Sequence, residues 1–244
     1  DKPEFDLVKM QNLLSKGYYN GKNLFIESAK AKNDNGYMHT SGNIPFDLNI
    51  GSSTFGKYFE NDFLNLNTKA ELSDLPFLSP YITELDSAEG NYEIMLNVKG
   101  PIGNLTRDGY IFIQDGILHT QLLNDPIKFI NGEAQLINNK LKIKNLSADL
   151  NIENVENIGR KNPNTKIVGE INLNKFFNPQ YNLKLESKNA SFKLLFLDIY
   201  GQTNLDLSIF GRDTVYISGK IEPEEVNVFY EFATEDIGTA IVED

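Results

Sequence analysis

Apolar and polar residues alternate with a period of two along several segments of this chain. In the segment YEIMLNVKG (92–100), Ile94, Leu96 and Val98 share one parity, while polar residues and Met95 occupy the other. This period is typical of β-strands that have one buried and one solvated face. The alternation predicts an all-β fold, and it recurs in the segments 169–173, 182–187 and 204–211.

Turn-forming and helix-like segments interrupt these strands. Two segments have apolar residues at helical spacing: 6–16, which Gly17 could cap, and 72–85, which contains Pro76 and Pro80. We therefore expect one or two short amphipathic helices lying on the sheet. Clusters of Gly, Pro and Asn predict turns at 33–36, 100–101, 138–139, 162–164 and 211–213.

The alternating segments repeat loosely in the order A, B, A, B. The A units begin as LFIESAKA at Leu24 and LKIKNLSA at Leu141, and the B units contain 92–100 and 204–211. Each unit leads through a loop to a Gly-x-Ile triplet. Such repetition predicts a single extended β architecture over residues 1–244, with units at about 22–50, 90–120, 139–175 and 181–231.

The apolar parity slips inside both A units, for example between Ile143 and Leu146. A strict period of two would turn the following residues to the solvated face. One extra residue in the strand restores the inward face and bends the strand at that point. The slip therefore predicts a β-bulge and a strongly curved sheet.

The composition excludes several classes of function. The net charge of −11 disfavours binding to phosphate backbones, and Lys140, Lys142 and Lys144 alternate with apolar residues as on a solvated sheet face. There is no cysteine, which removes disulfides and thiol chemistry. No apolar run reaches the roughly 20 residues of a transmembrane helix. The chain begins at Asp1 without a signal peptide, so we expect a fragment of a longer protein whose membrane anchor lies elsewhere.

Side chains that could carry catalysis or bind a metal form no recognisable motif. His39 and His119 lack acidic neighbours at metal-ligand spacing, so we interpret them as surface residues, His39 in a loop and His119 at a strand end. The acidic run 222–225 contains Pro223 and predicts an exposed turn or a guard on an edge strand. We predict no enzyme activity, no metal and no cofactor.

The order of the motifs carries a further indication. An apolar leader, LSDLPFLSPYITELDSAEG, precedes the strand of 92–100, and a Gly-x-Ile strand and the phrase NGEAQLINNKLKIKNLSA follow. In this order the phrases resemble the TamB branch of the AsmA-like envelope protein family, over residues 72–231. The chain departs from the family pattern at Arg107 and Asp108, where a proline is common before the Gly-x-Ile strand.

The resemblance implies both a fold and a function. A long sheet would form an open half-pipe, or β-taco, whose apolar lumen shields phospholipid acyl chains while their headgroups stay in water. The segment would belong to a lipid-transfer bridge across the periplasm of a Gram-negative envelope, a translocation and assembly module anchored in the inner membrane. The implied partners are phospholipid acyl chains and an outer-membrane barrel of the Omp85 type.

A curved sheet with one apolar face must have that face covered. A second sheet covers it in a sandwich, whereas lipid tails can cover it in a groove, at about 0.8 kcal/mol for each buried methylene. We predict that acyl chains contact twelve inner-face residues: Ile94, Leu96, Val98, Ile111, Ile113, Ile171, Leu173, Leu183, Leu185, Leu205, Leu207 and Ile209.

Two alternatives remain open from the sequence. The same repeats could form a closed solenoid or sandwich with a self-filled core, acting as a structural or adhesive envelope protein without a ligand. An enzyme, such as a polysaccharide-processing β-helix, would require carboxylates that converge in a cleft. Phospholipid that co-purifies with the protein would favour the groove over the self-filled core.

Overall fold

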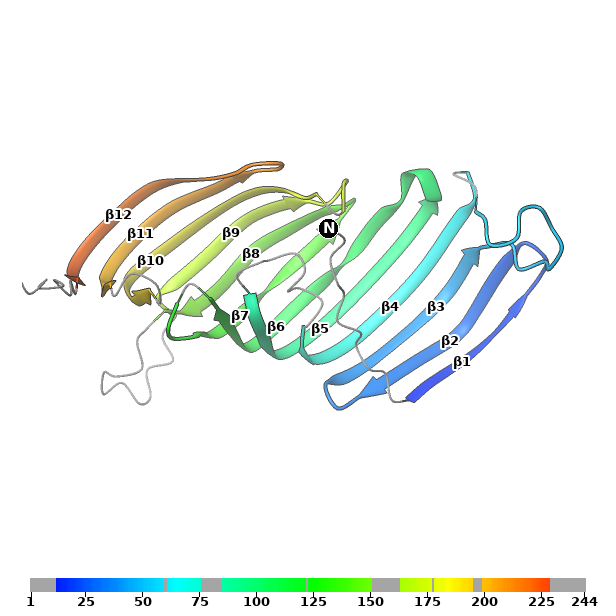
Figure 1. Ribbon diagram of the computed structural model, residues 1–244, viewed down its shortest axis with the longest axis horizontal. Helices are drawn as coiled ribbons and strands as arrows, with labels where there is room; N and C mark the ends of the chain where they lie inside the picture. Colours follow the sequence, from blue (N-terminus) through cyan, green and yellow to red (C-terminus); the bar gives the residue numbers. More distant parts are fainter. Residues whose placement is uncertain are drawn as a thin grey trace, which may run out of the picture.

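The computed structural model describes residues 12–58, 61–75, 85–121, 123–150, 163–176, 178–194 and 199–228. Within these ranges, twelve strands form one antiparallel sheet in which each strand pairs with its neighbours in the chain (Figure 1). The prediction of an all-β, elongated sheet is confirmed. The strands are β1 (Asn12–Tyr19), β2 (Asn23–Asn33), β3 (Gly36–Pro45), β4 (Phe63–Asp74), β5 (Leu85–Pro101), β6 (Thr106–Thr120), β7 (Ile127–Ile137), β8 (Lys140–Asp149), β9 (Thr165–Asn172), β10 (Gln180–Leu194), β11 (Ile199–Gly211) and β12 (Val215–Val228).

The sheet is a single layer in the described part of the chain. Extensive contacts join each strand only to the strands before and after it. The buried hydrophobic residues of this part are few and mostly small, so the larger apolar side chains of the strands stay partly exposed. They are Ala31, Ala70, Leu75, Leu85, Ala88, Tyr92, Leu136, Ala148 and Ala190.

The prediction of a helix over 6–16 is wrong for the residues that the structure describes. Residues 12–16 belong to β1, and Gly17 pairs with Ile26 of β2 instead of capping a helix. Pairing with β2 gives this segment a continuous ladder of hydrogen bonds, which outweighs its helical spacing of leucines. Residues 6–11 lie outside the described ranges.

The second predicted helix, 72–85, falls mostly outside the described ranges. Its first residues, 72–74, end β4, and Leu85 begins β5. Within the described ranges, the one helical element is a 3-10 turn at Ile102–Asn104, between β5 and β6.

Pairing irregularities lie in a line across the sheet from β4 to β7 and again from β10 to β12, whereas the pairing of β9 with β10 has none. At each of these positions the register between neighbouring strands shifts, and the strand bends. We call this line the bend line, and Figure 1 shows the strands curving along their length. Its irregular positions are Ser73, Gly90, Asp115, Phe129, Asn189 and Glu224.

Asparagine side chains replace ladder hydrogen bonds along the bend line. The amide nitrogen of Asp115 donates to Asn131 Oδ1 at 3.0 Å, and Asn131 Nδ2 donates to the carbonyl oxygen of Phe129 at 2.8 Å. Further along, the amide nitrogen of Asn189 donates to Asn204 Oδ1 at 2.9 Å. The backbone groups that the bulges remove from the ladder therefore remain hydrogen-bonded.

The β-bulges predicted in the A units are confirmed. The pairing of β8 with β9 shifts between Ile143 and Leu146, and the pairing of β2 with β3 shifts between Ile26 and Ala29. Each shift returns the next apolar residue to the same face as the previous one. The first three repeat units fall on the hairpins β2–β3, β5–β6 and β8–β9, and the fourth, at about 181–231, contains β10, β11 and β12.

Candidate functional site

One apolar residue from every strand lies in a single row across the sheet. Directly paired residues of neighbouring strands point to the same face. All members of this row, row one, therefore share one face, which we call the inner face. At about 4.8 Å for each strand spacing, the row extends about 53 Å. Its members are Leu13, Ala31, Met38, Ala70, Ile94, Ile111, Ala134, Ile143, Gly169, Leu183, Ile209 and Ile217.

Three further rows lie beside row one on the inner face. Row two contains Gly36, Leu72, Tyr92, Ile113, Gly132, Leu146, Ile167, Leu185, Leu207 and Gly219. Row three contains Ser15, Ala29, Thr40, Thr68, Leu96, Gly109, Leu136, Leu141, Ile171, Tyr181, Gly211 and Val215. Row four contains Gly17, Ile26, Gly42, Leu66, Val98 and Arg107.

Ten of the twelve residues predicted to contact acyl chains fall in these rows. All twelve are partly exposed, as expected of side chains on a face without an opposing layer. Row one holds Ile94, Ile111, Leu183 and Ile209; row two holds Ile113, Leu185 and Leu207; row three holds Leu96 and Ile171; and row four holds Val98.

The other two predicted residues lie outside the four rows. Leu205 pairs with Ser187 and Ile221, on the same face but beyond row two. Leu173 follows the end of β9, where its amide nitrogen donates to the carbonyl oxygen of Asn139 at 2.7 Å. The structure thus brings the predicted set together on one face, except at this loop position.

The twelve predicted lining residues leave out several inner-face residues that complete the rows. Ala134, Ile143 and Leu146 bridge β6 to β9, and Met38 and Ile217 extend row one toward the two edges. The slip in β8 predicted that Ile143 and Leu146 face inward, but it did not connect them with the other strands, and the small side chain of Ala134 gives little signal. Only the strand register shows that these residues continue the same rows.

A cluster of buried residues lies on the inner face, around the end of β4 and the first half of β5. Leu75, Leu85, Ala88 and Tyr92 form it. Tyr92 Oη donates to the carbonyl oxygen of Glu89 at 2.9 Å, and burial, followed by the charges of Asp74 and Glu89, raises the pKa of Tyr92. The cluster lies where β5 and β6 pass the bend line, so the curved sheet covers part of its own apolar surface. The partly buried residues packed against it are Leu72, Ile94, Ile113 and Leu118.

The opposite face of the sheet is mostly polar and charged, but it also exposes aromatic residues such as Phe112, Phe210 and Tyr216. Lys184 Nζ lies 2.6 Å from Glu186 Oε1 and 3.4 Å from Asp206 Oδ1. The hydrogen bond from Lys184 lowers the pKa of Glu186, and the bonds to Glu186 and Asp206 raise the pKa of Lys184. These pairs are exposed and contribute little to stability. They make this outer face easily hydrated, in contrast to the inner face.

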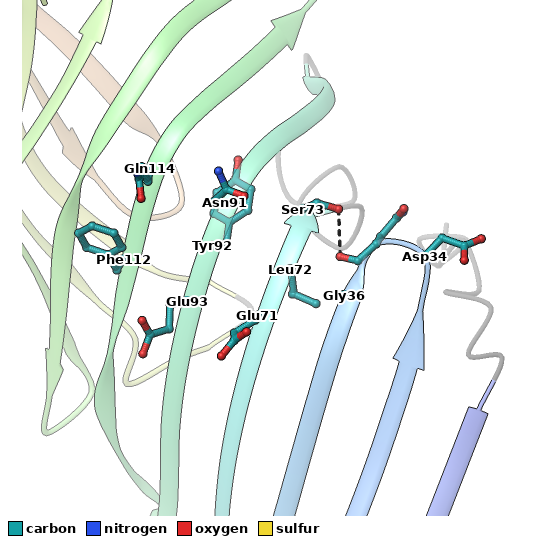
Figure 2. Close-up of a pocket in the computed structure, with 11 residues that line it drawn as sticks. Asp34, Gly36, Glu71, Leu72, Ser73, Asn91, Tyr92, Glu93, Phe112 and Gln114 are labelled. Atoms are coloured by element: carbon teal, nitrogen blue, oxygen red, sulfur yellow. Dashed lines mark hydrogen bonds between the residues drawn. The ribbon is translucent and has the colours of Figure 1, made fainter.

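A shallow pocket of about 400 Å³ lies at the start of β3, the end of β4 and the middle of β5 and β6, and its lining includes Gly36, Leu72 and Tyr92 of row two as well as outer-face residues (Figure 2). Glu71, Glu93 and Phe112 line it from paired positions on β4, β5 and β6. Ser73 Oγ at its rim donates to the carbonyl oxygen of Asn35 at 3.1 Å. The pocket combines carboxylates with amide and hydroxyl groups, without an activated nucleophile beside a base.

The histidines occupy structural positions on two strands. His39 lies in β3, so its placement in a loop was wrong; its Nε2 is 3.1 Å from Ser28 Oγ. His119 lies next to the end of β6, as predicted. In the described part of the chain, no three His, Cys, Asp or Glu residues gather in a way that could hold a metal ion.

The acidic run 222–225 lies in β12, the last strand of the sheet, and its residues are exposed. Of the two expectations, the structure places the run on an edge strand of the described part and not in a turn; its action as a guard stays a prediction. Proline and charged side chains on an edge oppose the addition of another strand. Large apolar residues nevertheless remain exposed at both edges, including Leu13 at 69% and Ile217 at 67%.

No helix within the described ranges has the length and apolar character required to cross a membrane. No protein-family model matches the chain, and neither a curated protein nor a solved structure matches it. The chemistry and the geometry of the two faces are therefore the features that indicate a function.

Proposed function

We propose that this chain is a segment of a lipid-transfer bridge of the TamB/AsmA-like type, which shields phospholipid acyl chains on its inner face. The bridge would run through the periplasm between the inner and outer membranes of a Gram-negative envelope. An outer-membrane barrel of the Omp85 type is the protein partner that goes with this proposal.

The observation that carries the proposal is row one. It crosses all twelve strands with apolar residues or glycine alone. Its larger members stay partly exposed, and no second layer covers them in the described part of the chain. A fully buried methylene contributes about 0.8 kcal/mol, so contact along one side of a long acyl chain yields several kcal/mol. The row can therefore hold hydrocarbon along its whole length.

The apolar character of the rows suits movement of a lipid as well as binding. An acyl chain that shifts by one strand along row one meets another apolar side chain or glycine, and these range in size from Gly169 and Ala134 to Ile and Leu. The polar groups of rows one to three are few: the hydroxyls of Ser15, Thr40 and Thr68, of which the two threonines hydrogen-bond to each other at 3.0 Å, and the phenols of Tyr92 and Tyr181. Because no charged side chain lies in these three rows, no ionic contact would hold a lipid at one position.

The self-filled alternative is less well supported. A sandwich or solenoid core requires an opposing layer and many large buried residues. In the described part of the chain, five of the nine buried hydrophobic residues are alanines, and each strand contacts only its neighbours extensively. Both features favour an open face over a closed core.

Site-specific photocrosslinking tests the proposal. A photoreactive amino acid replaces Ile111 on the inner face or, as a matched control, Tyr110 on the outer face of the same strand. After incubation with vesicles of phosphatidylethanolamine and phosphatidylglycerol, lipid adducts are expected at position 111 and not at position 110. The substitutions Ile113→Asp, in row two of the same strand, and Leu207→Glu, in row two on β11, should reduce the adducts while circular dichroism still shows a folded sheet.

Two results would contradict the proposal. Equal crosslinking on both faces would mean that lipid associates with the sheet without preference for the inner face. Unchanged crosslinking in Ile113→Asp and Leu207→Glu would mean that these positions do not line a conduit. Native mass spectrometry of gently purified protein adds an independent measurement, since bound phospholipid is expected.

A further inference from the structure

One charged residue interrupts the inner face. Among the described residues that make up rows one to four, Arg107 alone carries a charge. It is the second residue of β6 and pairs with Val98 of β5. The turn Ile102–Asn104 immediately precedes this strand, so Arg107 lies at the rim of the inner face, where apolar surface meets water.

The surroundings of Arg107 hold its guanidinium in place. Its Cζ lies 5.4 Å from the centre of the Phe176 ring, and its Nη1 donates to Asn139 Oδ1 at 3.2 Å. Asn139 is buried, and two hydrogen bonds hold it in place. Its Nδ2 donates to the carbonyl oxygen of Leu105 at 3.1 Å, and its backbone nitrogen donates to the carbonyl oxygen of Arg107 at 3.0 Å. The guanidinium is therefore oriented before any ligand arrives.

The charge of Arg107 has no acidic partner in the described part of the chain. The neighbouring Asp108 belongs to the outer face, where its Oδ2 lies 3.7 Å from Lys99 Nζ and its Oδ1 accepts from the amide nitrogen of Asn138. A guanidinium has five N–H donors, and a single one of them is used here, by Asn139. The remaining donors can form the paired hydrogen bonds that arginine makes with phosphate.

We propose that Arg107 binds the phosphate of a phospholipid headgroup while the acyl chains of the same lipid lie on rows one to four. This inference rests on the proposed function and adds the residue that would hold the headgroup phosphate, at the rim of the inner face. The juxtaposition of Arg107 with Val98 in row four and Ile111 in row one places a cation at the edge of apolar surface. A phospholipid presents the complementary arrangement of an anionic phosphate beside hydrocarbon.

Binding of two lipids with identical acyl chains tests the inference. Phosphatidylglycerol carries the phosphate, and diacylglycerol lacks it. For Arg107→Gln, we expect affinity for phosphatidylglycerol to fall about tenfold, as for loss of a hydrogen-bonded charge contact, and affinity for diacylglycerol to stay unchanged. Arg107→Lys keeps the charge without the paired donors, so its affinity for phosphatidylglycerol should lie between those of the unmodified protein and of Arg107→Gln.

Lys99→Gln is the matched control. It removes one positive charge from the outer face at the neighbouring level of the sheet, where Lys99 pairs with Thr106. It should leave the affinity for both lipids unchanged, which separates a contact at Arg107 from a general effect of net charge. Circular dichroism confirms that the variants remain folded.

Each outcome decides between the claims. If the unmodified protein binds neither lipid, the proposed function fails and the inference falls with it. If both lipids bind and Arg107→Gln weakens both equally, or weakens neither, the inner face binds hydrocarbon but Arg107 does not recognise phosphate. If glycerol phosphate, which has no acyl chains, binds as tightly as phosphatidylglycerol, the site serves a soluble phosphate ester, and the assignment to lipid is overturned.

Discussion

Replacing Gly169 with alanine tests the backbone geometry on which the inner face depends. Gly169 occupies the place of a side chain in row one, between Ile143 and Leu183. Its φ of +135° lies in a region that residues with a Cβ rarely adopt. A Cβ at this position would lie 2.3 Å from the carbonyl oxygen of Asn182 and 2.9 Å from the Cα of Leu183. Both atoms belong to the backbone of β10, so no side chain can turn away.

The expected cost follows from two separable effects. The backbone conformation alone costs about 1–3 kcal/mol for a residue that is not glycine. Relieving the contact with Asn182 requires β9 and β10 to move apart by about 1 Å, which breaks or weakens neighbouring ladder hydrogen bonds at about 1 kcal/mol each. We therefore expect Gly169→Ala to lower the free energy of unfolding by about 3–5 kcal/mol.

Gly21→Ala is the control that separates the two effects. Gly21, in the turn between β1 and β2, also has a positive φ of +92°, but a Cβ there would have nothing within 4 Å. Gly21→Ala should lower the free energy of unfolding by about 1–2 kcal/mol, because only the backbone conformation is strained. Urea denaturation followed by circular dichroism gives the overall loss, and hydrogen exchange of the β9 and β10 amides locates it. An equal loss in both variants would refute the claim that Gly169 keeps these strands at close range.

Three further predictions concern the bend line, the buried cluster and the edge. Asn131→Ala removes the hydrogen bonds to Asp115 and Phe129, so it should lower the free energy of unfolding in urea by about 1 kcal/mol and speed the hydrogen exchange of the Asp115 amide. Asn97→Ala, at an outer-face asparagine, is the control, and a loss no larger than in this control would contradict the role of the bend line. Tyr92 has a raised pKa, so its contribution to stability should be complete below the ordinary tyrosine pKa of about 10 and be lost as the pH rises through the higher folded value. The difference in unfolding free energy between the unmodified chain and Tyr92→Phe should then change in this alkaline range and stay constant below it; a constant difference throughout would show that burial does not affect this phenol. The double substitution Pro223→Val and Glu224→Thr removes the proline and one charge from the edge strand β12, so it should increase self-association measured by light scattering. Glu186→Thr on β10, away from the edge, is the control, and no increase over this control would mean that other features protect the edge.

The alternation of apolar residues was sufficient to predict the all-β fold and most of the strands. In β5 and β11 the period of two is unbroken over the central residues, and each side chain lies on the predicted face. The slip between Ile143 and Leu146 even predicted a bulge, because an apolar residue cannot face water without a cost. The prediction was wrong for residues 12–16, where leucines that fit a helix instead pair with β2.

The candidate site was predictable only in part. Ten of the twelve proposed lining residues fall into four rows, because they lie in strands with regular alternation. Arg107 was noted as a departure from a family pattern, but not as a member of the inner face. Its partners Asn139 and Phe176 are 32 and 69 positions away in the sequence, and no local pattern connects residues so far apart.

The sequence by itself determined which residues of each strand face together, because the two-residue period is a property of an extended backbone. The tertiary structure decided which residues of different strands lie side by side, since the register depends on bulges and turns whose effects accumulate from one strand to the next. It also decided that the apolar face remains without an opposing layer in the described part of the chain. An alternating segment is equally compatible with a sandwich core and with an open sheet, because both require one apolar face, and they differ in what covers it.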